Sequence, residues 1–573
     1  MDLKLSEKNS RYFWFLAAAC VVSLFLCLGE SLFNTRGEPR EAVVALTMLT
    51  DGDWILPINN GVDMPYKPPF MHWGIALIST LTGGINEFTS RFPSALALSL
   101  MVLSGYKFYA RRRGAGIALL ASFLTLTNFE VHRAGMACRV DMVLTFMMVG
   151  ALYLLFIWVE KGFKGIPWLG ILCLSGAFLS KGPVGAALPC LTVAVYAWIR
   201  QHGFWRVLGK MFLAGLLSCI LPFAWYIAAY QQGGAPFLTL VYEENVLRLL
   251  GKMTYASHIN PAWYNFQTVI TGFLPYSLLV LMSLFVLRNR KPTGTVAAWW
   301  SRVKDYVRHM DDTRLFSLVS IIVIFGFYCI PASKRSVYLL PVYPFLAYFL
   351  AEFIVWLRDH HTRLLRSYGW IIGSLVLLTS VFFVAIRAGL IPESLFGGSA
   401  HSGSDQDLFA SLHDTPLTPL GILGFIAALT ALGFFIRTRR QATRLIPGIL
   451  AMVFSLFFVL DALYLPMILN AKSDKPVAEQ IARIAPEGKV YSYRSDVCEG
   501  NRMHPFTINF YLNNRVIPFD VFLPEAGYVI VGNDDIEVFR QTYPDYEVEQ
   551  VVDFNHKSCD DRHMTKLYRF DKR

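Results

Sequence analysis

The sequence contains few charged residues for its length. Charged residues make up only 16% of the 573 positions, whereas 54% are hydrophobic and the mean hydropathy is +0.43. A soluble globular domain carries about 25% charged residues, so this composition excludes an ordinary soluble fold. Apolar runs of about 17 to 25 residues recur along the chain, and each is long enough to cross a bilayer as a helix. The sequence therefore predicts a polytopic α-helical membrane protein.

Zinc modules and nucleic-acid surfaces are also lacking. Seven of the nine cysteines lie in or next to apolar runs, and no Cys/His spacing is typical of a zinc module. The other two, Cys498 and Cys559, lie in the polar C-terminal part. An oxidising compartment would allow them to form a disulfide, and two free thiols are the alternative. The net charge of +11 comes without a basic stripe of interleaved aromatics, so it predicts basic cytoplasmic loops and contact with anionic membrane lipid, not nucleic acid.

The charges between the apolar runs predict an orientation. Fourteen runs can be counted, and the N-terminal one is expected to be a retained first span. If all fourteen crossed from a cytoplasmic N-terminus, the basic loops at 111–113, 200–210 and 288–314 would lie outside, against the positive-inside rule. The run 68–84 is the weakest, because it is short and begins with two prolines. We therefore expect about thirteen transmembrane helices, with 68–84 at the outer surface and the C-terminal part outside.

The composition changes near residue 470. Residues 1–469 form the predicted transmembrane domain, and residues 470–573 have the composition of a soluble domain. Apolar periodicity predicts helices at 475–485 and 535–543 and strands at 489–494, 527–532, 547–554 and 564–570. These elements predict a small α/β domain of roughly 100 residues. No active site of its own is evident in it.

Polar segments on the predicted outer side carry acids and cations. The first of them, 34–67, contains a short amphipathic helix from Glu38 to Leu49, with proline in its first turn. The others are the turns at 139–141 and 181–183, the polar segment 231–262, and the short loop after the tenth run. The charged residues of interest are Glu38, Arg40, Lys67, Arg139, Asp141, Lys181, Arg248, Lys334 and Arg335. Any one of them has an ordinary explanation, such as an acid at a helix start or a lysine that snorkels to the interface.

Taken together, these residues favour a particular chemistry. Cations gathered beside a membrane surface suit a lipid phosphate. One or two acids among them suit the orientation or activation of a hydroxyl nucleophile. The combination predicts a glycosyl transfer whose leaving group is a lipid phosphate.

The stretch "GEPREAVVALTMLTDGDWILPINNGVDMPYKPPFMHW" at 37–73 resembles the first outer loop of the GT-C-type, lipid-linked-sugar glycosyltransferases. Within them it is most similar to the aminoarabinose transferases that modify lipid A and to bacterial relatives of the protein O-mannosyltransferases. Four further stretches resemble the family in the same order: "RVDMVLTF" at 139–146, "FLSKGPVG" at 178–185, "HINPAWYNF" at 258–266 and "SKRSVYLLPVYPF" at 333–345. The resemblance extends through about the first 350 residues.

The resemblance implies a multi-pass enzyme of the bacterial inner membrane, with its active face and C-terminal domain in the periplasm. It implies a polyprenyl-phosphate sugar as donor, and lipid A or another glycan or protein as acceptor. The family's two acids map to Glu38 and Asp141 as catalytic residues. Its donor phosphate-binding cations map to Lys67 of the KPP motif, Lys181 of the KGP motif and Arg40, and we add Arg335. Accessory candidates are Arg139, Arg248, Lys334 and Tyr338.

Two departures from the family affect these expectations. Many relatives have an Asp-Glu pair where this chain has Gly37 and Glu38, so Glu38 would act alone. Aminoarabinose transferases also place a glutamate before the KPP lysine, where it helps to hold zinc, and this position is Tyr66 here. A divalent metal is therefore an open expectation, with His258 or His72 as the candidate ligand. No other cofactor is expected.

Two alternatives remain at this stage. A transporter of lipid-linked sugars would share the spans and the phosphate-binding cations. Transporters often show internal repeats and broken helices at mid-membrane, whereas this sequence shows no repeat and places its charges near the outer surface. A protein or polysaccharide O-glycosyltransferase of the same superfamily would differ only in its acceptor. The sequence does not identify the sugar, for which 4-amino-4-deoxy-L-arabinose or a related sugar is the expectation.

Overall fold

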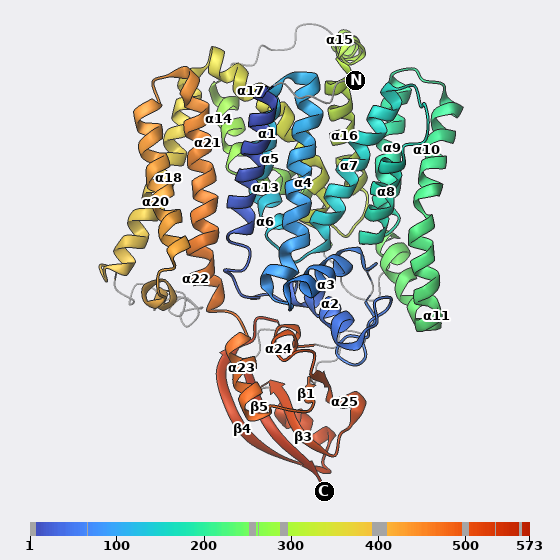
Figure 1. Cartoon of the computed structure of the whole chain (residues 1–573), viewed down its shortest axis with the longest axis vertical. Coiled ribbons are helices and arrows are strands. Elements are labelled where there is room, and N and C mark those ends of the chain that lie inside the picture. The colour runs from blue at the N-terminus through green and yellow to red at the C-terminus, as the bar shows by residue number, and fades with distance from the viewer. Residues whose placement is uncertain are drawn as a thin grey trace.

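The chain forms a helical domain followed by a small sheet domain, as the computed structural model shows (Figure 1). The structure describes residues 7–65, 67–250, 252, 259–261, 263–286, 296–391, 409–494, 504–532, 535–560 and 564–573. The sheet domain lies at one end of the helical domain, next to helices α2 and α3 and opposite the N-terminus (Figure 1). Helix α22 ends at Asn470, and the elements of the sheet domain follow it in the sequence.

The first domain is built of helices, most of which pack around one large hydrophobic core beside two smaller apolar clusters. They are α1 Glu7–Cys20, α2 Pro39–Asp51, α3 Phe70–Thr82, α4 Glu87–Arg113, α5 Ala115–Leu126, α6 Phe129–Gly135, α7 Val140–Glu160, α8 Trp168–Lys181, α9 Val184–Ile199, α10 Phe204–Ser218, α11 Ile220–Tyr242, α12 Arg248–Leu250, α13 Tyr264–Gly272, α14 Tyr276–Val286, α15 Val296–His309, α16 Asp312–Cys329, α17 Tyr343–His360, α18 Thr362–Arg387, α20 Pro419–Thr438, α21 Ala442–Val459 and α22 Leu465–Asn470. Short turns of π- or 3₁₀-helix lie at Val21–Phe25, Glu243–Leu247, Ser336–Val342 and Leu460–Tyr464.

Within the described residues, seven helical stretches are long and apolar enough to cross a membrane. The number rises to nine if each of two bent pairs, α5 with α6 and α13 with α14, forms one span. A multi-pass helical membrane protein is thereby confirmed. The expected total of about thirteen spans, and the side on which each loop lies, remain predictions.

Local sequence explains how the first outer segment folds. The predicted amphipathic helix is α2, which begins at Pro39 and ends where Gly52 adopts a left-handed conformation with φ of 75°. Helix α3 has only 13 residues, and at 1.5 Å per residue it is too short to cross a bilayer core of about 30 Å. Helices α2 and α3 lie together beside the sheet domain (Figure 1).

The polar segment 231–262 begins as helix. Helix α11 continues through Tyr242, and further helical turns extend to Leu250. The helix bends at Gly234, whose φ of 58° is not helical. Glu244 is tolerated on this helix because its carboxylate pairs with Arg248, one helical turn later.

The C-terminal domain has the predicted α/β architecture. Five strands, β1 Val490–Tyr493, β2 Val516–Pro518, β3 Ala526–Gly532, β4 Tyr546–Lys557 and β5 Met564–Lys572, form one sheet in the order β2-β1-β3-β5-β4. Helices α23 Lys475–Ile484, α24 Phe506–Tyr511, α25 Phe519–Phe522 and α26 Ile536–Thr542 pack against it. The four strands and two helices expected from periodicity are confirmed. Strand β2 and helices α24 and α25 were missed because they are too short to show a period.

The pairing of Cys498 with Cys559 falls outside the described residues, since Cys498 is not among them. The Cys559 thiol lies 3.4 Å from the Thr507 hydroxyl and donates to it.

The sheet domain contacts the first outer segment directly. The Asn509 amide donates to the Asn60 side chain at 2.5 Å. Phe33 packs edge-on against Phe510 with ring centroids 4.9 Å apart. The Tyr511 hydroxyl donates to Glu87 at 2.6 Å and accepts the Phe33 backbone N–H at 3.2 Å. The domain therefore supports the loop on which the family motifs lie.

Replacement of Tyr511 by phenylalanine is expected to destabilise the protein. It leaves a carboxylate oxygen and a backbone N–H without partners, which costs about 1–3 kcal/mol. The measurement is the thermal unfolding midpoint of the purified protein in detergent. Tyr528→Phe is the matched control, because Tyr528 lies half-buried in β3 with no hydroxyl hydrogen bond among the described residues. Equal midpoints for the two variants would contradict this role of Tyr511.

Candidate functional site

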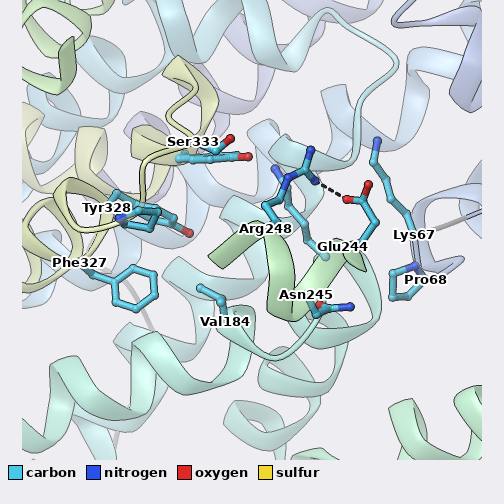
Figure 2. Close-up of a pocket in the computed structure, with 12 residues that line it drawn as sticks. Lys67, Pro68, Val184, Glu244, Asn245, Arg248, Phe327, Tyr328 and Ser333 are labelled. Carbon is cyan, nitrogen blue, oxygen red and sulfur yellow. Dashed lines mark hydrogen bonds and ion pairs between the residues drawn. The ribbon is translucent and has the colours of Figure 1, made fainter. Parts of the chain in front are cut away.

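A cavity of about 130 Å³ opens where several segments far apart in the sequence converge. It is lined by Lys67, Pro68, Lys181, Val184, Glu244, Asn245, Arg248, Phe327, Tyr328, Pro331, Ser333 and Tyr338. Lys67 and the Arg248–Glu244 ion pair lie on one side of the cavity, and Phe327, Tyr328 and Ser333 lie on the other (Figure 2). The cavity thus combines cations with an aromatic and apolar wall, as a lipid phosphate with its attached chain requires.

Lys181 enters the cavity from the end of α8. Gly182 and Pro183 terminate this helix, because Gly182 has a φ of 94° and proline cannot continue it. The Lys181 ammonium pairs with the carboxylate of Asp141 in the first turn of α7. It also lies 4.5 Å from the ring centroid of Tyr338. The structure therefore brings together three predicted residues from three separate segments.

Gly182→Ala is expected to lower activity by roughly tenfold or more, because it displaces Lys181. An alanine here would have a strained φ, and its Cβ would lie 2.5 Å from the Asn245 side-chain oxygen. The measurement is the transfer rate at saturating donor. Gly162→Ala is the control, since Gly162 has a φ of 65° but open space around its Cβ position. If both variants lost activity equally, backbone strain alone would account for the effect.

Lys67 is held by a carboxylate that sequence reasoning missed. The Glu41 carboxylate accepts from Lys67, from Arg40 at 3.2 Å and from the His72 Nε2 at 3.1 Å. Burial disfavours the charged form of Glu41, but Lys67, His72 and Arg40 outweigh it and hold its pKa well below 4.5. A single acid at the start of the otherwise apolar stretch 42–49 was the available signal, because an acid beside apolar residues is costly without a function.

Glu41→Gln is expected to change the dependence of stability on pH. Since the pKa of Glu41 is depressed in the folded state, its charged form stabilises the fold above pH 4.5, and this contribution is lost as the pH falls through the folded-state pKa. The variant should have a lower melting temperature than wild type at pH 7. On acidification its melting temperature should fall by less than that of wild type. Melting temperatures between pH 3 and 7 would test this, with the exposed Glu479→Gln as control. Parallel curves for Glu41→Gln and wild type would contradict it.

Glu38 occupies a different place from Asp141. Its carboxylate accepts two hydrogen bonds from the Arg91 guanidinium at 2.8 and 3.1 Å, and one from the Cys138 backbone N–H at 2.8 Å. Burial disfavours its charge, yet Arg91 and the Cys138 N–H lower its pKa. Neither acid is among the residues that line the cavity, but Asp141 pairs with Lys181, which lines it, whereas Glu38 pairs with Arg91, which does not. Glu38 links the first outer segment to α4 and to the loop before α7.

Of three further predicted cations, one lines the cavity and two do not. Arg248 lines the cavity and pairs with Glu244. Lys334 is buried, and its ammonium donates to the backbone oxygens of Asn260 at 3.2 Å and Pro331 at 2.6 Å, so it fastens the loop before residue 336. Arg335 is half-buried and its guanidinium forms no ion pair with any residue that the structure describes.

The described residues do not assemble a metal site. His258 and Tyr66 lie outside the described residues. Among those that are described, no group of three His, Cys, Asp or Glu side chains is placed to hold a metal ion. Glu41 and His72 are adjacent, but the Lys67 ammonium already occupies the carboxylate. The set of donors in the described part of the chain therefore fits an ion-pair cluster and not a metal centre.

Comparison with known proteins supports a common family. The family described as dolichyl-phosphate-mannose-protein mannosyltransferase matches residues 66–227, a segment that contains Lys67, Asp141 and Lys181. The undecaprenyl phosphate-alpha-4-amino-4-deoxy-L-arabinose arabinosyl transferase 2 of Proteus mirabilis is 27% identical over 365 residues, which cover 62% of each chain. The transferase of the same kind from Edwardsiella ictaluri is 26% identical over 396 residues, or 67% of each chain.

Solved structures share the whole fold. The crystal structure of ArnT from Cupriavidus metallidurans bound to undecaprenyl phosphate superposes with a TM-score of 0.70, at 19% identity, over 98% of both chains. The apo structure of the same protein gives 0.69. The resemblance predicted from the sequence motifs is thereby confirmed, and it extends beyond residue 350 to the C-terminal domain.

Proposed function

We propose that this protein, a GT-C-type glycosyltransferase similar to the aminoarabinose transferases, moves a sugar from a polyprenyl phosphate to lipid A or another acceptor. The sugar is 4-amino-4-deoxy-L-arabinose or a related sugar, and the reaction takes place at the periplasmic face of a bacterial inner membrane. The single observation that carries the proposal is the convergence of Lys67, Lys181 and Arg248 on one cavity. These three cations come from three segments far apart in the sequence.

The cavity suits the donor phosphate. Each of its three cations has a carboxylate partner: Glu41, Asp141 and Glu244. These carboxylates hold the cations in place before the donor arrives. The donor phosphate then adds its own charge within reach of the ammonium and guanidinium groups, which stabilise the negative charge that grows on the departing polyprenyl phosphate. Arg40 and Arg335 strengthen the positive potential around this position.

Asp141 is the acid that we assign to the acceptor. Its carboxylate contacts Lys181, so it adjoins the position proposed for the donor phosphate. We assign Asp141 to orienting the acceptor, and to taking its proton if the acceptor is a hydroxyl. The acceptor oxygen attacks the anomeric carbon, the bond to the phosphate oxygen breaks, and the electron pair leaves with the polyprenyl phosphate. The role we assign to Glu38 is positioning, because Arg91 engages both of its oxygens.

Direct transfer of label tests the proposal. Purified protein in detergent is given a panel of radiolabelled polyprenyl-phosphate sugars, with lipid A or a membrane extract as acceptor. Wild type is compared with Lys67→Ala, Asp141→Asn and the control Lys164→Ala, which removes an exposed lysine from the α7–α8 loop. Label that moves to an acceptor in wild type and control, and not in the two site variants, would support the transferase and name its substrates. Donor binding without any transfer would favour a transporter of lipid-linked sugars.

A further inference from the structure

A second cation position lies beside the cavity, at the contact between the first two outer segments. The Arg139 guanidinium lies over the backbone of Gly37: a Cβ atom at Gly37 would come within 1.8 Å of its Nη2 and 2.5 Å of its Cζ. Gly37 precedes α2, and Arg139 immediately precedes α7. The guanidinium can therefore occupy this position only because residue 37 is a glycine and has no side chain. The acid that many relatives carry at this position could not be accommodated unless Arg139 moved.

Arg139 forms no ion pair with any residue that the structure describes. Two acids, Glu38 and Asp141, both feel its charge. However, Arg91 engages Glu38 and Lys181 engages Asp141. The side chain of Arg139 forms no hydrogen bond or ion pair within the described part of the chain, although it is half-buried. Its backbone is fixed, because the Arg139 carbonyl accepts from the Ser94 hydroxyl at 3.1 Å.

Glu38 and Asp141 act on Arg139 only through their charge, so the N–H donors of its guanidinium stay available for a ligand. Guanidinium presents a planar set of N–H donors that suits a phosphate or carboxylate bound through two oxygens. The site is thus built for an anion that comes from outside the chain.

This anion is distinct from the donor phosphate. Arg139 is not among the residues that line the donor cavity. Lys181, Lys67 and Arg139 all act on the Asp141 carboxylate through their charge, but it is Lys181 that pairs with this carboxylate, while the Arg139 guanidinium lies against Gly37. In a transfer between two lipids, the second anion belongs to the acceptor.

We propose that Arg139 binds an anionic group of the acceptor and selects acceptors that carry one, phosphate above all. This inference rests on the proposed function. An anionic acceptor oxygen attacks the anomeric carbon without first losing a proton, and the electron pair of the broken bond leaves with the polyprenyl phosphate. Arg139 holds the attacking group beside Asp141 and offsets the repulsion between two anions that approach each other.

The test measures acceptor binding separately from transfer. Purified protein without donor is equilibrated with radiolabelled lipid A, or with the same lipid after enzymatic removal of its phosphates. Wild type is compared with Arg139→Gln, with Gly37→Ala, which keeps the charge but displaces the guanidinium, and with Arg133→Gln. Arg133 is the control because it lies on the neighbouring helix α6, is exposed and pairs with Glu130. Binding of polyprenyl phosphate serves as the folding check.

We expect wild type and Arg133→Gln to prefer the phosphorylated lipid. Arg139→Gln should lose roughly tenfold or more of that preference, as for loss of a charged hydrogen bond, and Gly37→Ala should lose part of it. Polyprenyl phosphate should bind all four proteins equally. If Arg139→Gln bound both lipids as wild type does, or lost polyprenyl phosphate binding instead, the assignment would be overturned. Because binding is read without donor, a failure of sugar transfer would count against the proposed function alone.

Discussion

Lys67→Ala is expected to lower kcat/KM for the polyprenyl-phosphate sugar by on the order of 10²- to 10³-fold, the loss seen when one electrostatic donor is removed from an active site. The Lys67 ammonium lines the cavity and is fixed by Glu41, so it reaches the donor phosphate without reorganisation. Because the same contact is made before and during reaction, donor binding should weaken together with the rate. The measurement is initial transfer rate against donor concentration, beside equilibrium binding of polyprenyl phosphate.

Two further variants sharpen this result. Lys67→Arg keeps the charge but changes its shape, and should recover only part of the activity. Lys164→Ala removes a lysine far from the cavity and should behave as wild type. If Lys67→Ala bound and transferred normally, Lys67 would be only an anchor at the membrane interface, which is the ordinary role of a lysine at the edge of an apolar run.

Asp141→Asn is expected to lower kcat by roughly 10²-fold while leaving donor affinity unchanged or slightly improved. Asparagine has nearly the same shape but can neither accept a proton nor neutralise Lys181, with which Asp141 pairs. The freed ammonium makes the cavity more positive, which favours the bound donor phosphate. The loss in kcat arises because the acceptor is no longer oriented and Lys181 is no longer held in place.

The contrast between the two variants is the informative measurement. Lys67→Ala should raise the donor dissociation constant, whereas Asp141→Asn should not. Asp461→Asn is the control, because it makes the same isosteric change at a buried carboxylate elsewhere in the helical domain. Asp461 pairs with His132 at 2.6 Å. Weaker donor binding by Asp141→Asn than by wild type would contradict the assignment of Asp141 to the acceptor side.

Much of the architecture followed from the sequence because its signals are local. Apolar runs marked the membrane class, Pro39 and the apolar period marked α2, and alternation after residue 470 marked most of the sheet domain. Lys67 and Lys181 could be proposed from the sequence because the KPP and KGP motifs in which they lie resemble those of the family, and a motif is a local signal.

The partners of the charged residues were not local, and only the tertiary structure decided them. Glu38 and Glu41 lie three positions apart on the same segment, yet Arg91 engages the first and Lys67 the second. Lys334 and Arg335 are neighbours in sequence, but the first is tied to backbone oxygens and the second is not.

The sequence by itself determined which residues could carry the chemistry, since charge in an apolar chain is costly and is kept only where it has a partner or a ligand. The packing of the elements around α2, α4 and α7 decided which of these residues have a partner within the protein. The others are the ones that we propose receive a partner from a substrate. That packing places Arg139 over Gly37, and no spacing along the chain predicts it, because the two residues meet only through the fold.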